Sequence, residues 1–428
     1  MAGALAGAGV GLSGIVRILM YMPGLSPGSL GWQVHLDFAD AVRSLGHGFE
    51  IVTSTQSHTG VRVDDAAGSV RTSAPFARWN PVSRWAAPLL RTANLLPWAS
   101  ALARYLALHG KEFDLLHVEV AYPHATAAVL GARWANWKGP IAITPMGEDV
   151  LVLRDAHYGF RRHWLPRLLV RGTLRRAQAV RCISGAALRA VRAIAPRARC
   201  EVIPLNVTES TAAAAEVDDH AARERRREAR ARISAELGLG DRPLVLALGR
   251  LHPFKGIPGL IDAMTHVRGE AVLVVAGPSL SGKAFGDHAA AVRAHADEAG
   301  LGERFRWIGA VEPDRALELL CAADVLVVPS LLESLNKVCV EAAAVRTPFV
   351  VTATTGIAEW VPPSGVGLVV PPRDPATLAS AIERVLGGGF IVDPAACRAF
   401  VSRFAPRRVA AEVVRFYESE IFDSRRRA

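Results

Sequence analysis

The chain has 428 residues, of which 50% are hydrophobic, and its formal net charge of +10 corresponds to a pI near 9.9. This length exceeds one ordinary hydrophobic core and predicts two or more domains, while the apolar content excludes an intrinsically disordered chain. No apolar run approaches the ~18 to 20 residues that span a bilayer. The cysteines have no metal-binding spacing, and their odd number within apolar segments predicts reduced thiols in the cytosol. They are Cys182, Cys200, Cys321, Cys339 and Cys397.

The opening residues, 1–16, are rich in Ala and Gly and lack the charged segment of a signal peptide, so we expect no secretion signal. Three glycines have the G-x-G-x-x-G spacing of a dinucleotide-binding fingerprint: Gly9, Gly11 and Gly14. They precede the first expected strand, 15–21, whereas the fingerprint requires the strand first and the glycines after it. We therefore exclude a dinucleotide site here.

A second glycine-bearing loop follows that strand at 22–35 and leads into an amphipathic helix ending near residue 45. Glycines in such a loop let the backbone approach a phosphate or a sugar closely. They are Gly24, Gly28 and Gly31. For Gly24 and Gly28 an ordinary turn is an equally good explanation.

Polar residues also follow two later strands of the first half. His124 stands in the loop after the expected strand 114–119, directly before a helix, which makes it a candidate site residue. A lone histidine more often has a structural role, and that is our interpretation of His117 within the strand. Glu148 and Asp149 follow the expected strand 141–145 and could bind a ligand or simply cap the loop.

Positive charge is concentrated in the segment 160–176. Arg167, Arg171 and Arg175 fall one helical turn apart, and Trp164, Leu165, Leu168 and Leu169 lie elsewhere on the same helix. A basic amphipathic helix of this kind predicts contact with anionic lipid, and a solvated arginine surface explains it equally well. The Ala-, Arg- and Glu-rich segment 211–237 has charges of mixed sign, so we expect an exposed helix rather than a nucleic-acid-binding arm.

In the second half, the segment 243–264 predicts a strand, a loop and a helix, with Arg250 and Lys255 in the loop. A guanidinium and an ammonium at the carboxyl end of a strand suit a diphosphate. Only five of the 50 basic residues are lysines. A retained lysine therefore indicates a requirement for a compact charge, with chance as the alternative. Lys255 and Lys337 both fall in the expected phosphate site.

Two carboxylates, Glu333 and Glu341, are separated by seven residues. The apolar run 323–330 predicts a buried parallel strand, which puts Glu333 in the following loop and Glu341 in the next helix. Open α/β sheets bind ligands at this edge, where the free amides of a helix start favour anions. The two carboxylates can therefore hold two hydroxyl-bearing ends of one ligand, with phosphates between them. A nucleotide sugar has this form, and two ordinary exposed glutamates are the alternative.

These segments resemble glycosyltransferase family 4, a family of retaining enzymes with the GT-B fold. The resemblance covers nearly the whole chain and is densest from 243 to 372. It rests on Gly-Arg-Leu-x-x-x-Lys-Gly at 249–256, Val-Ala-Gly-Pro at 275–278, Arg-Trp-Ile-Gly at 306–309, Ala-Ala-Asp-Val-x-x-x-Pro-Ser at 322–330 and the Glu-x7-Glu pair. In this order and combination the motifs are highly specific.

The resemblance implies a role for each matching residue. Arg250 and Lys255 would bind the donor diphosphate and stabilise the departing nucleoside diphosphate. Glu341 would hold the ribose hydroxyls and Glu333 the transferred sugar, while Ile308 would contact the base through its backbone. The remaining donor-binding residues would be Gly31 in the first glycine loop and the phosphate-binding amides of Leu335, Asn336 and Lys337.

The catalytic residues that follow from these roles are His124, Arg250, Lys255 and Glu333. Many family members use a histidine at the position of His124 to hydrogen-bond the donor sugar or to stabilise its developing charge. On the acceptor side we expect Glu148 and Asp149 to orient a hydroxyl, with loop capping as the alternative.

The chain departs from the family pattern at several positions. Ser334-Leu335-Asn336 stands where the family often has Gly-Phe-Gly, and Asn336 can keep the shape of the loop because Asn tolerates positive φ. Met146 stands where a histidine is frequent, and Thr355-Gly356 replaces a Gly-Gly pair. These departures leave the identity of the sugar open more than the class of reaction.

We therefore expect an α/β protein of the GT-B class with two Rossmann-like domains facing a central cleft. The N-terminal, acceptor-side domain would span 1–208, and a charged helical linker would span 209–240. The nucleotide-sugar donor domain would span 241–409, followed by a C-terminal helix, 410–428, that packs back on the first domain.

The expected activity is transfer of a sugar, with retention, from a nucleoside diphosphate sugar to a glycan, lipid-linked or small-molecule acceptor. No Asp-x-Asp occurs in the chain, so we expect neither a metal nor another cofactor. We expect a cytoplasmic protein that reaches the inner membrane face through 160–176, with no nucleic-acid partner. The alternatives are a nucleotide-sugar epimerase and a non-catalytic sugar-binding protein of the same fold.

Overall fold

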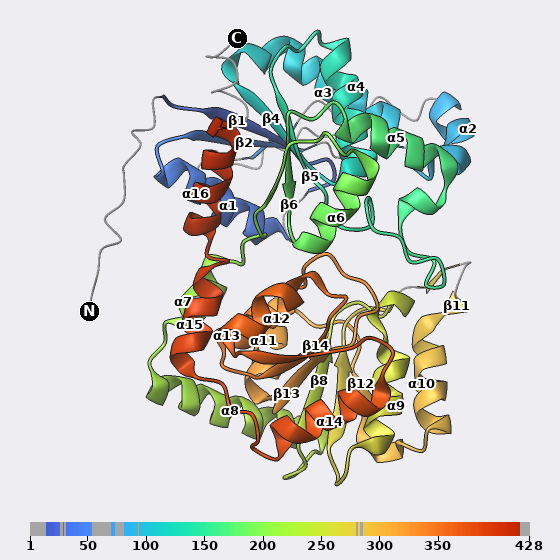
Figure 1. The fold of residues 1–428 in the computed structure, drawn as a ribbon, viewed down its shortest axis with the longest axis vertical. Coiled ribbons are helices and arrows are strands. Elements are labelled where there is room, and N and C mark those ends of the chain that lie inside the picture. The colour runs from blue at the N-terminus through green and yellow to red at the C-terminus, as the bar shows by residue number, and fades with distance from the viewer. Residues whose placement is uncertain are drawn as a thin grey trace.

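The computed structural model describes residues 14–25, 29, 31–53, 70–72, 81–92, 94–279, 281–282 and 286–419. The expectations for Gly9, Gly11 and Gly28 fall outside these residues, as does the end of the C-terminal helix after 419. Figure 1 shows two α/β halves stacked along the long axis of the molecule, with the last helices running along one side of both. The predicted architecture of two Rossmann-like domains is confirmed.

The N-terminal domain contains a parallel sheet with the strand order β3-β2-β1-β4-β5-β6-β7. Its strands are β1 (Arg17–Tyr21), β2 (Gly48–Thr53), β3 (Val70–Thr72), β4 (Leu115–Glu119), β5 (Ile141–Thr144), β6 (Ala179–Cys182) and β7 (Cys200–Val202). Its helices are α1 (Trp32–Ser44), α2 (Pro81–Leu90), α3 (Leu95–His109), α4 (Thr126–Trp134), α5 (Trp164–Leu174) and α6 (Gly185–Ile194), with short helical turns η1 (Gly110–Glu112), η2 (Ala121–Ala125) and η3 (Phe160–Arg162).

The central strands β1, β4 and β5 are mostly apolar because helices cover both faces of the sheet. On one face, Ile18 and Met20 of β1 pack with Phe38 of α1 and with the C-terminal helix. On the other face, Leu19 of β1 packs with residues of α3 and α4, including Leu102. Both faces are thus buried, and polar strand residues such as His117 and Arg181 are buried with them.

The C-terminal domain contains a second parallel sheet, of order β12-β9-β8-β13-β14-β15. Its strands are β8 (Leu244–Leu248), β9 (Val272–Ala276), β12 (Phe305–Trp307), β13 (Val325–Val328), β14 (Phe349–Thr352) and β15 (Gly367–Val370), and β10 (Ser281–Gly282) pairs with β11 (Gly286–Asp287) beside it. The helices are α9 (Ile257–His266), α10 (His288–Glu298), α11 (Pro313–Ala322), α12 (Val338–Ala344), α13 (Val361–Ser364) and α14 (Pro375–Leu386), with turns η4 (Pro253–Lys255), η5 (Gly302–Arg304) and η6 (Gly356–Trp360).

The strand order of this second sheet reverses at β8. The chain continues from β8 to β9 on one side, whereas β13 pairs with β8 on the other side. The loops that leave the carboxyl ends of β8 and β13 therefore diverge, and ligands bind in the crevice at such a switch point. The loop after β8 contains Arg250 and Lys255, and the loop after β13 contains Glu333.

Helices join the two domains. After α7 (Glu209–Ala215), helix α8 (Asp219–Leu237) packs on α11 of the second domain, burying Ala229 and Ile233. Helix α15 (Pro394–Ser402) packs on α12, and α16 (Pro406–Tyr417) returns to pack on α1. At the interface itself the rings of Tyr158 and Phe254, one from each domain, lie 4.4 Å apart between centroids.

Candidate functional site

The loops after β8 and β13 are bound directly to each other. The amide of Leu331 donates to the carbonyl of Phe254 at 2.8 Å. Gly256 has a φ of 70°, and a Cβ there would lie 2.2 Å from the carbonyl oxygen of Pro329. Only glycine allows this close approach, which holds Lys255 against the end of β13.

An ion pair between Lys255 and Glu333 forms the centre of the candidate site. The Lys255 Nζ donates to Glu333 Oε1 at 2.6 Å, and the two side chains are only 15% and 17% exposed. The other carboxylate oxygen, Oε2, accepts hydrogen bonds from Ser330 Oγ and Asn336 Nδ2, each at 2.9 Å. Burial raises the pKa of Glu333, but the Lys255 charge and these hydrogen bonds outweigh it, so the pKa lies below its ordinary value.

The backbone between Glu333 and α12 has the shape that the sequence predicted. Asn336 has a φ of 78°, which confirms that this asparagine occupies the left-handed region. Its side chain is the one that donates to Glu333, so the residue both turns the chain and positions the carboxylate. The strained turn places Leu335, Asn336 and Lys337 directly before the first turn of α12, where backbone amides have no partner within the helix.

Lys337 and Glu341 stand one helical turn apart at the start of α12. Burial raises the pKa of Glu341 and lowers that of Lys337, and in each case the opposite charge of the other partly offsets the shift. Burial also raises the pKa of the Cys339 thiol, and both Glu333 and Glu341 add to this increase. Both carboxylates therefore lie near Cys339, on the same part of the domain.

Arg250 is exposed directly after β8, and its charge acts on Glu148 and Tyr158 of the N-terminal domain. An ideal Cβ on the neighbouring Gly249 would be 3.7 Å from Lys255 Nζ, so the two cations follow adjacent parts of one loop. Burial raises the pKa of Glu148, and the Arg250 charge opposes this effect across the domain interface. Glu148 and Arg250 thus approach the same space from opposite domains.

Asp149, by contrast, is fully buried. Its carboxylate accepts hydrogen bonds from the amides of Gly147, at 2.8 Å, of Met146 and of Ala121. This geometry supports loop capping, which was the alternative to an acceptor-binding role. The capped loop contacts the opposite domain, because Ser334 Oγ donates to the carbonyl of Met146 at 2.6 Å.

His124 lies in η2, between β4 and α4. Its ring packs edge-on against Trp98 with centroids 5.0 Å apart, and its Nδ1 has no hydrogen-bond partner among the described residues. Burial lowers the pKa of His124 to about 4, although the Glu119 carbonyl acts in the opposite direction. The imidazole is therefore neutral at pH 7, which suits a hydrogen bond to a sugar rather than a positive charge beside it.

The two remaining donor-site residues flank the interface. Gly31 is the N-cap of α1 with a φ of 90°, and it leaves the backbone bare where the helix begins. The amide of Ile308 donates to the carbonyl of Val275 at 3.0 Å, so any contact between Ile308 and a base would be made through its carbonyl oxygen.

Sequence reasoning missed two polar residues of this region, Glu119 and His35. Glu119 ends β4 with only 4% exposure, and His35 lies on the first turns of α1 with 9%. Glu119 opposes the lowering of the pKa of Lys337, and Lys337 contributes to lowering that of His35, so both lie near the start of α12. The sequence signal that could have revealed Glu119 is an acidic residue at the end of a largely apolar strand.

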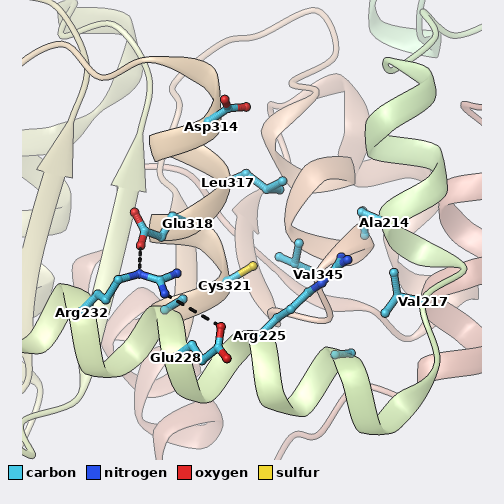
Figure 2. Close-up of a pocket in the computed structure, with 13 residues that line it drawn as sticks. Ala214, Val217, Arg225, Glu228, Arg232, Asp314, Leu317, Glu318, Cys321 and Val345 are labelled. Atoms are coloured by element: carbon cyan, nitrogen blue, oxygen red, sulfur yellow. Dashed lines mark hydrogen bonds and ion pairs between the residues drawn. The ribbon is translucent and has the colours of Figure 1, made fainter.

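A pocket of about 280 Å³ lies elsewhere, between α8 and α11, as Figure 2 shows. It includes Ala344 and Val345 at the end of α12, whereas Lys337 and Glu341 are near the start of this helix. Its charged wall is internally paired, with Arg232 bonded to Glu318 at 2.6 Å. None of the predicted donor-site residues lines this pocket.

Two further features are absent from the described residues. No group of three or more His, Cys, Asp or Glu is arranged there to hold a metal ion. Among the helices of the same residues, none combines the length and the apolar character that a membrane span requires.

Comparisons with known proteins agree with this geometry. Residues 31–206 match the family model of the glycosyl transferase 4-like domain, and residues 229–394 match that of glycosyl transferases group 1. The D-inositol 3-phosphate glycosyltransferase of Mycobacteroides abscessus is 34% identical over 165 residues, which are 38% of this chain and 37% of that protein. The match thus spans little more than a third of the length of this relative.

Solved structures resemble nearly the whole chain. Sucrose-phosphate synthase from Thermosynechococcus elongatus has a TM-score of 0.71 at 22% identity, covering 94% of this chain and 98% of that one. HepE of Anabaena in complex with UDP-glucose has a TM-score of 0.68 at 18% identity, covering 94% and 99%. Each half of the chain thus matches the model of a glycosyltransferase domain, and the chain shares the two-domain GT-B fold of the solved structures.

Proposed function

We propose that the protein is a retaining glycosyltransferase of family 4 that moves a sugar from a nucleoside diphosphate sugar to an acceptor hydroxyl. The observation that supports this best is the pairing of Lys255 with Glu333 at the switch point of the second sheet, beside Arg250. Glu341 stands one helical turn beyond Lys337, which suits a ribose next to a diphosphate. The UDP-glucose complex of a protein with this fold supports a nucleotide-sugar donor.

In the proposed reaction, Arg250 and Lys255 stabilise the negative charge that grows on the departing diphosphate. Glu333 positions the Lys255 ammonium and accepts a hydrogen bond from a hydroxyl of the transferred sugar. The departing phosphate oxygen takes the proton of the acceptor hydroxyl on the same face of the sugar, so the anomeric configuration is retained. No covalent protein nucleophile takes part in this scheme.

The N-terminal domain supplies the other proposed contacts. The neutral His124 hydrogen-bonds the donor sugar, and Glu148 orients the acceptor hydroxyl from the loop opposite Arg250. We assign Asp149 to holding that loop in shape, because its carboxylate is occupied by backbone amides. Side-chain cations supply the charge that a divalent metal would otherwise provide, so we propose that the reaction is metal-independent.

We also propose that the protein acts at the cytoplasmic face of a membrane, on a lipid-linked acceptor. Helix α5 exposes Trp164 (63%) and Leu168 (56%) together with Arg167 and Arg171. Helix α2 packs beside it and exposes Trp85 at 87%. Aromatic rings and arginines on one surface suit an anionic bilayer.

Vesicle flotation with phosphatidylglycerol and with phosphatidylcholine tests the membrane proposal. The protein should float with the anionic vesicles only, and the double variant Trp85→Ser and Trp164→Ser should remain in the lower fraction. Equal recovery of wild type and variant with anionic vesicles would contradict the proposal.

The donor proposal is tested by thermal shift with nucleoside diphosphates and their sugar esters. The nucleotide that binds should raise the unfolding temperature, since a ligand specific for the native state stabilises it. Incubation with the donor sugar alone should give only slow hydrolysis. Rapid conversion of the donor into an isomer would instead identify an epimerase, and the absence of any stabilising nucleotide would reject the donor site.

A further inference from the structure

The side chain of Glu119 is a buried carboxylate without a full set of partners. Its backbone belongs to β4, between β1 and β5, and the side chain is only 5% exposed. The Oε2 atom accepts no hydrogen bond from any described residue. A carboxylate oxygen that is buried without a hydrogen bond costs free energy, so such an atom is expected to receive a donor from a ligand or a water.

The imidazole of His35 lies close to this oxygen. The His35 Nε2 lies 3.8 Å from Glu119 Oε2. His35 stands four residues after Gly31, and an ideal Cβ on Gly31 would lie 3.7 Å from the same Nε2. The imidazole edge therefore faces both the Glu119 carboxylate and the bare backbone at the start of α1.

The separation of the two groups fits one bridging hydroxyl. At 3.8 Å they are too far apart for a hydrogen bond with each other, but one oxygen atom can lie about 2.8 Å from both. A sugar hydroxyl donates to the carboxylate and accepts from the imidazole N–H, whereas a phosphate would be repelled by the carboxylate. Burial lowers the pKa of His35, so the ring is neutral and available for this role.

The location of this pair connects it to the donor site. Lys337, at the start of α12, is close enough to Glu119 and Glu341 for both carboxylates to oppose the lowering of its pKa. Glu119 thus lies across the interface from the residues expected to bind the ribose and the phosphates. The buried guanidinium of Arg181, on which the Glu119 charge also acts, already donates to the carbonyl of Ile203 at 3.1 Å and to that of Pro204.

We propose that Glu119 and His35 form a hydroxyl-binding subsite for the sugar of the nucleoside diphosphate donor. This inference rests on the proposed function and adds to it the residues that recognise the sugar from the N-terminal domain. It separates recognition of the sugar, by this pair and Glu333, from recognition of the diphosphate by Arg250 and Lys255.

The subsite is tested by calorimetric titration with nucleotides that do and do not carry a sugar. Each probe pair consists of a nucleoside diphosphate and its sugar ester: UDP with UDP-glucose or UDP-N-acetylglucosamine, GDP with GDP-mannose, or ADP with ADP-glucose. The variants are then measured with the pair that binds wild type. In Glu119→Gln the affinity for the sugar ester should fall at least tenfold, about 1.4 kcal/mol, while that for the bare diphosphate changes less than twofold. Glu112→Gln, an exposed carboxylate of the same domain, should change neither.

The second variant, His35→Asn, keeps the test decisive if Glu119→Gln does not fold, because it removes the opposite hydrogen bond. It should show the same selective loss for the sugar ester. Equal weakening of both ligands, or unchanged affinity for the sugar ester, would overturn the subsite. If wild type binds none of the nucleotides, the proposed function itself fails, which is a distinct result.

Discussion

Lys255→Ala is the most informative single substitution in the proposed site. The ammonium of Lys255 is expected to stabilise the departing diphosphate, and loss of one such charge stabiliser costs ~2.7–4 kcal/mol in comparable sites. Because Arg250 and Lys337 remain, we expect turnover to fall by one to three orders of magnitude. The affinity for the nucleoside diphosphate should fall as well, since we expect the ammonium to contact the diphosphate before and during the reaction.

The same substitution should also reduce stability, because it leaves Glu333 without its counter-ion. Removing one partner of a fully buried ion pair costs ~3–5 kcal/mol. Here the side chains keep 15% and 17% exposure and Glu333 keeps its bonds to Ser330 and Asn336. We therefore expect a loss of about 1–2 kcal/mol, below that range because water still screens the pair.

The stability loss should depend on pH in a defined direction. Lys255 and its neighbours hold the pKa of Glu333 below its ordinary 4.5, so the stabilisation is fully present above that pH. It disappears as the pH falls through the depressed pKa of the folded state. The difference in Tm between wild type and Lys255→Ala should therefore be largest near neutrality and shrink in acid.

The matched control is Lys111→Ala, which removes an exposed lysine of the N-terminal domain. Turnover is followed by release of the nucleoside diphosphate, affinity by calorimetry, and stability by thermal unfolding at neutral and acid pH. If Lys255→Ala equals Lys111→Ala in turnover and nucleotide affinity, Lys255 has no part in the mechanism. A constant Tm difference across the pH range would refute the role assigned to the ion pair.

Three further predictions concern the same site. Glu341→Gln should weaken nucleoside diphosphate binding about tenfold but leave pyrophosphate binding unchanged, as a ribose contact worth ~1.4 kcal/mol requires; equal loss for both ligands would exclude that contact. Asn336→Val should lower stability by about 1–2 kcal/mol more than Asn336→Gly in thermal unfolding. Both variants lose the hydrogen bond to Glu333, so the difference reports the strain of a β-branched residue at a φ of 78°. Activity should persist in EDTA, and complete loss with rescue by manganese would contradict metal independence.

The predictions from the sequence were best where the signal was local. The apolar run 323–330 and the helix-forming residues after it placed Glu333 in a loop and Glu341 in α12, and the structure agrees. The positive φ of Asn336 was also predictable, since it depends on the turn itself. The expectation of two domains followed from the length of the chain, and that of the GT-B architecture from the family resemblance of its motifs.

Contacts between distant segments were not predictable in the same way. Lys255 and Glu333 were expected to bind separate parts of a donor, and only the folded sheet reveals that they pair with each other. Asp149 was a candidate for acceptor binding, but its carboxylate is taken by amides from its own loop and from Ala121. Hydrogen-bond partners of this kind depend on side-chain positions that no sequence pattern records.

The expected class of fold came from the resemblance of the motifs to a known family. By itself the sequence determined the order of the strands along the chain and the loops in which the charged residues stand. Those properties follow from apolar periodicity and turn chemistry over short stretches. The tertiary structure decided which of these loops meet. His35, Glu119 and Lys337 come together because parallel strands from distant parts of the chain end at one edge and because α12 faces that edge across the domain interface.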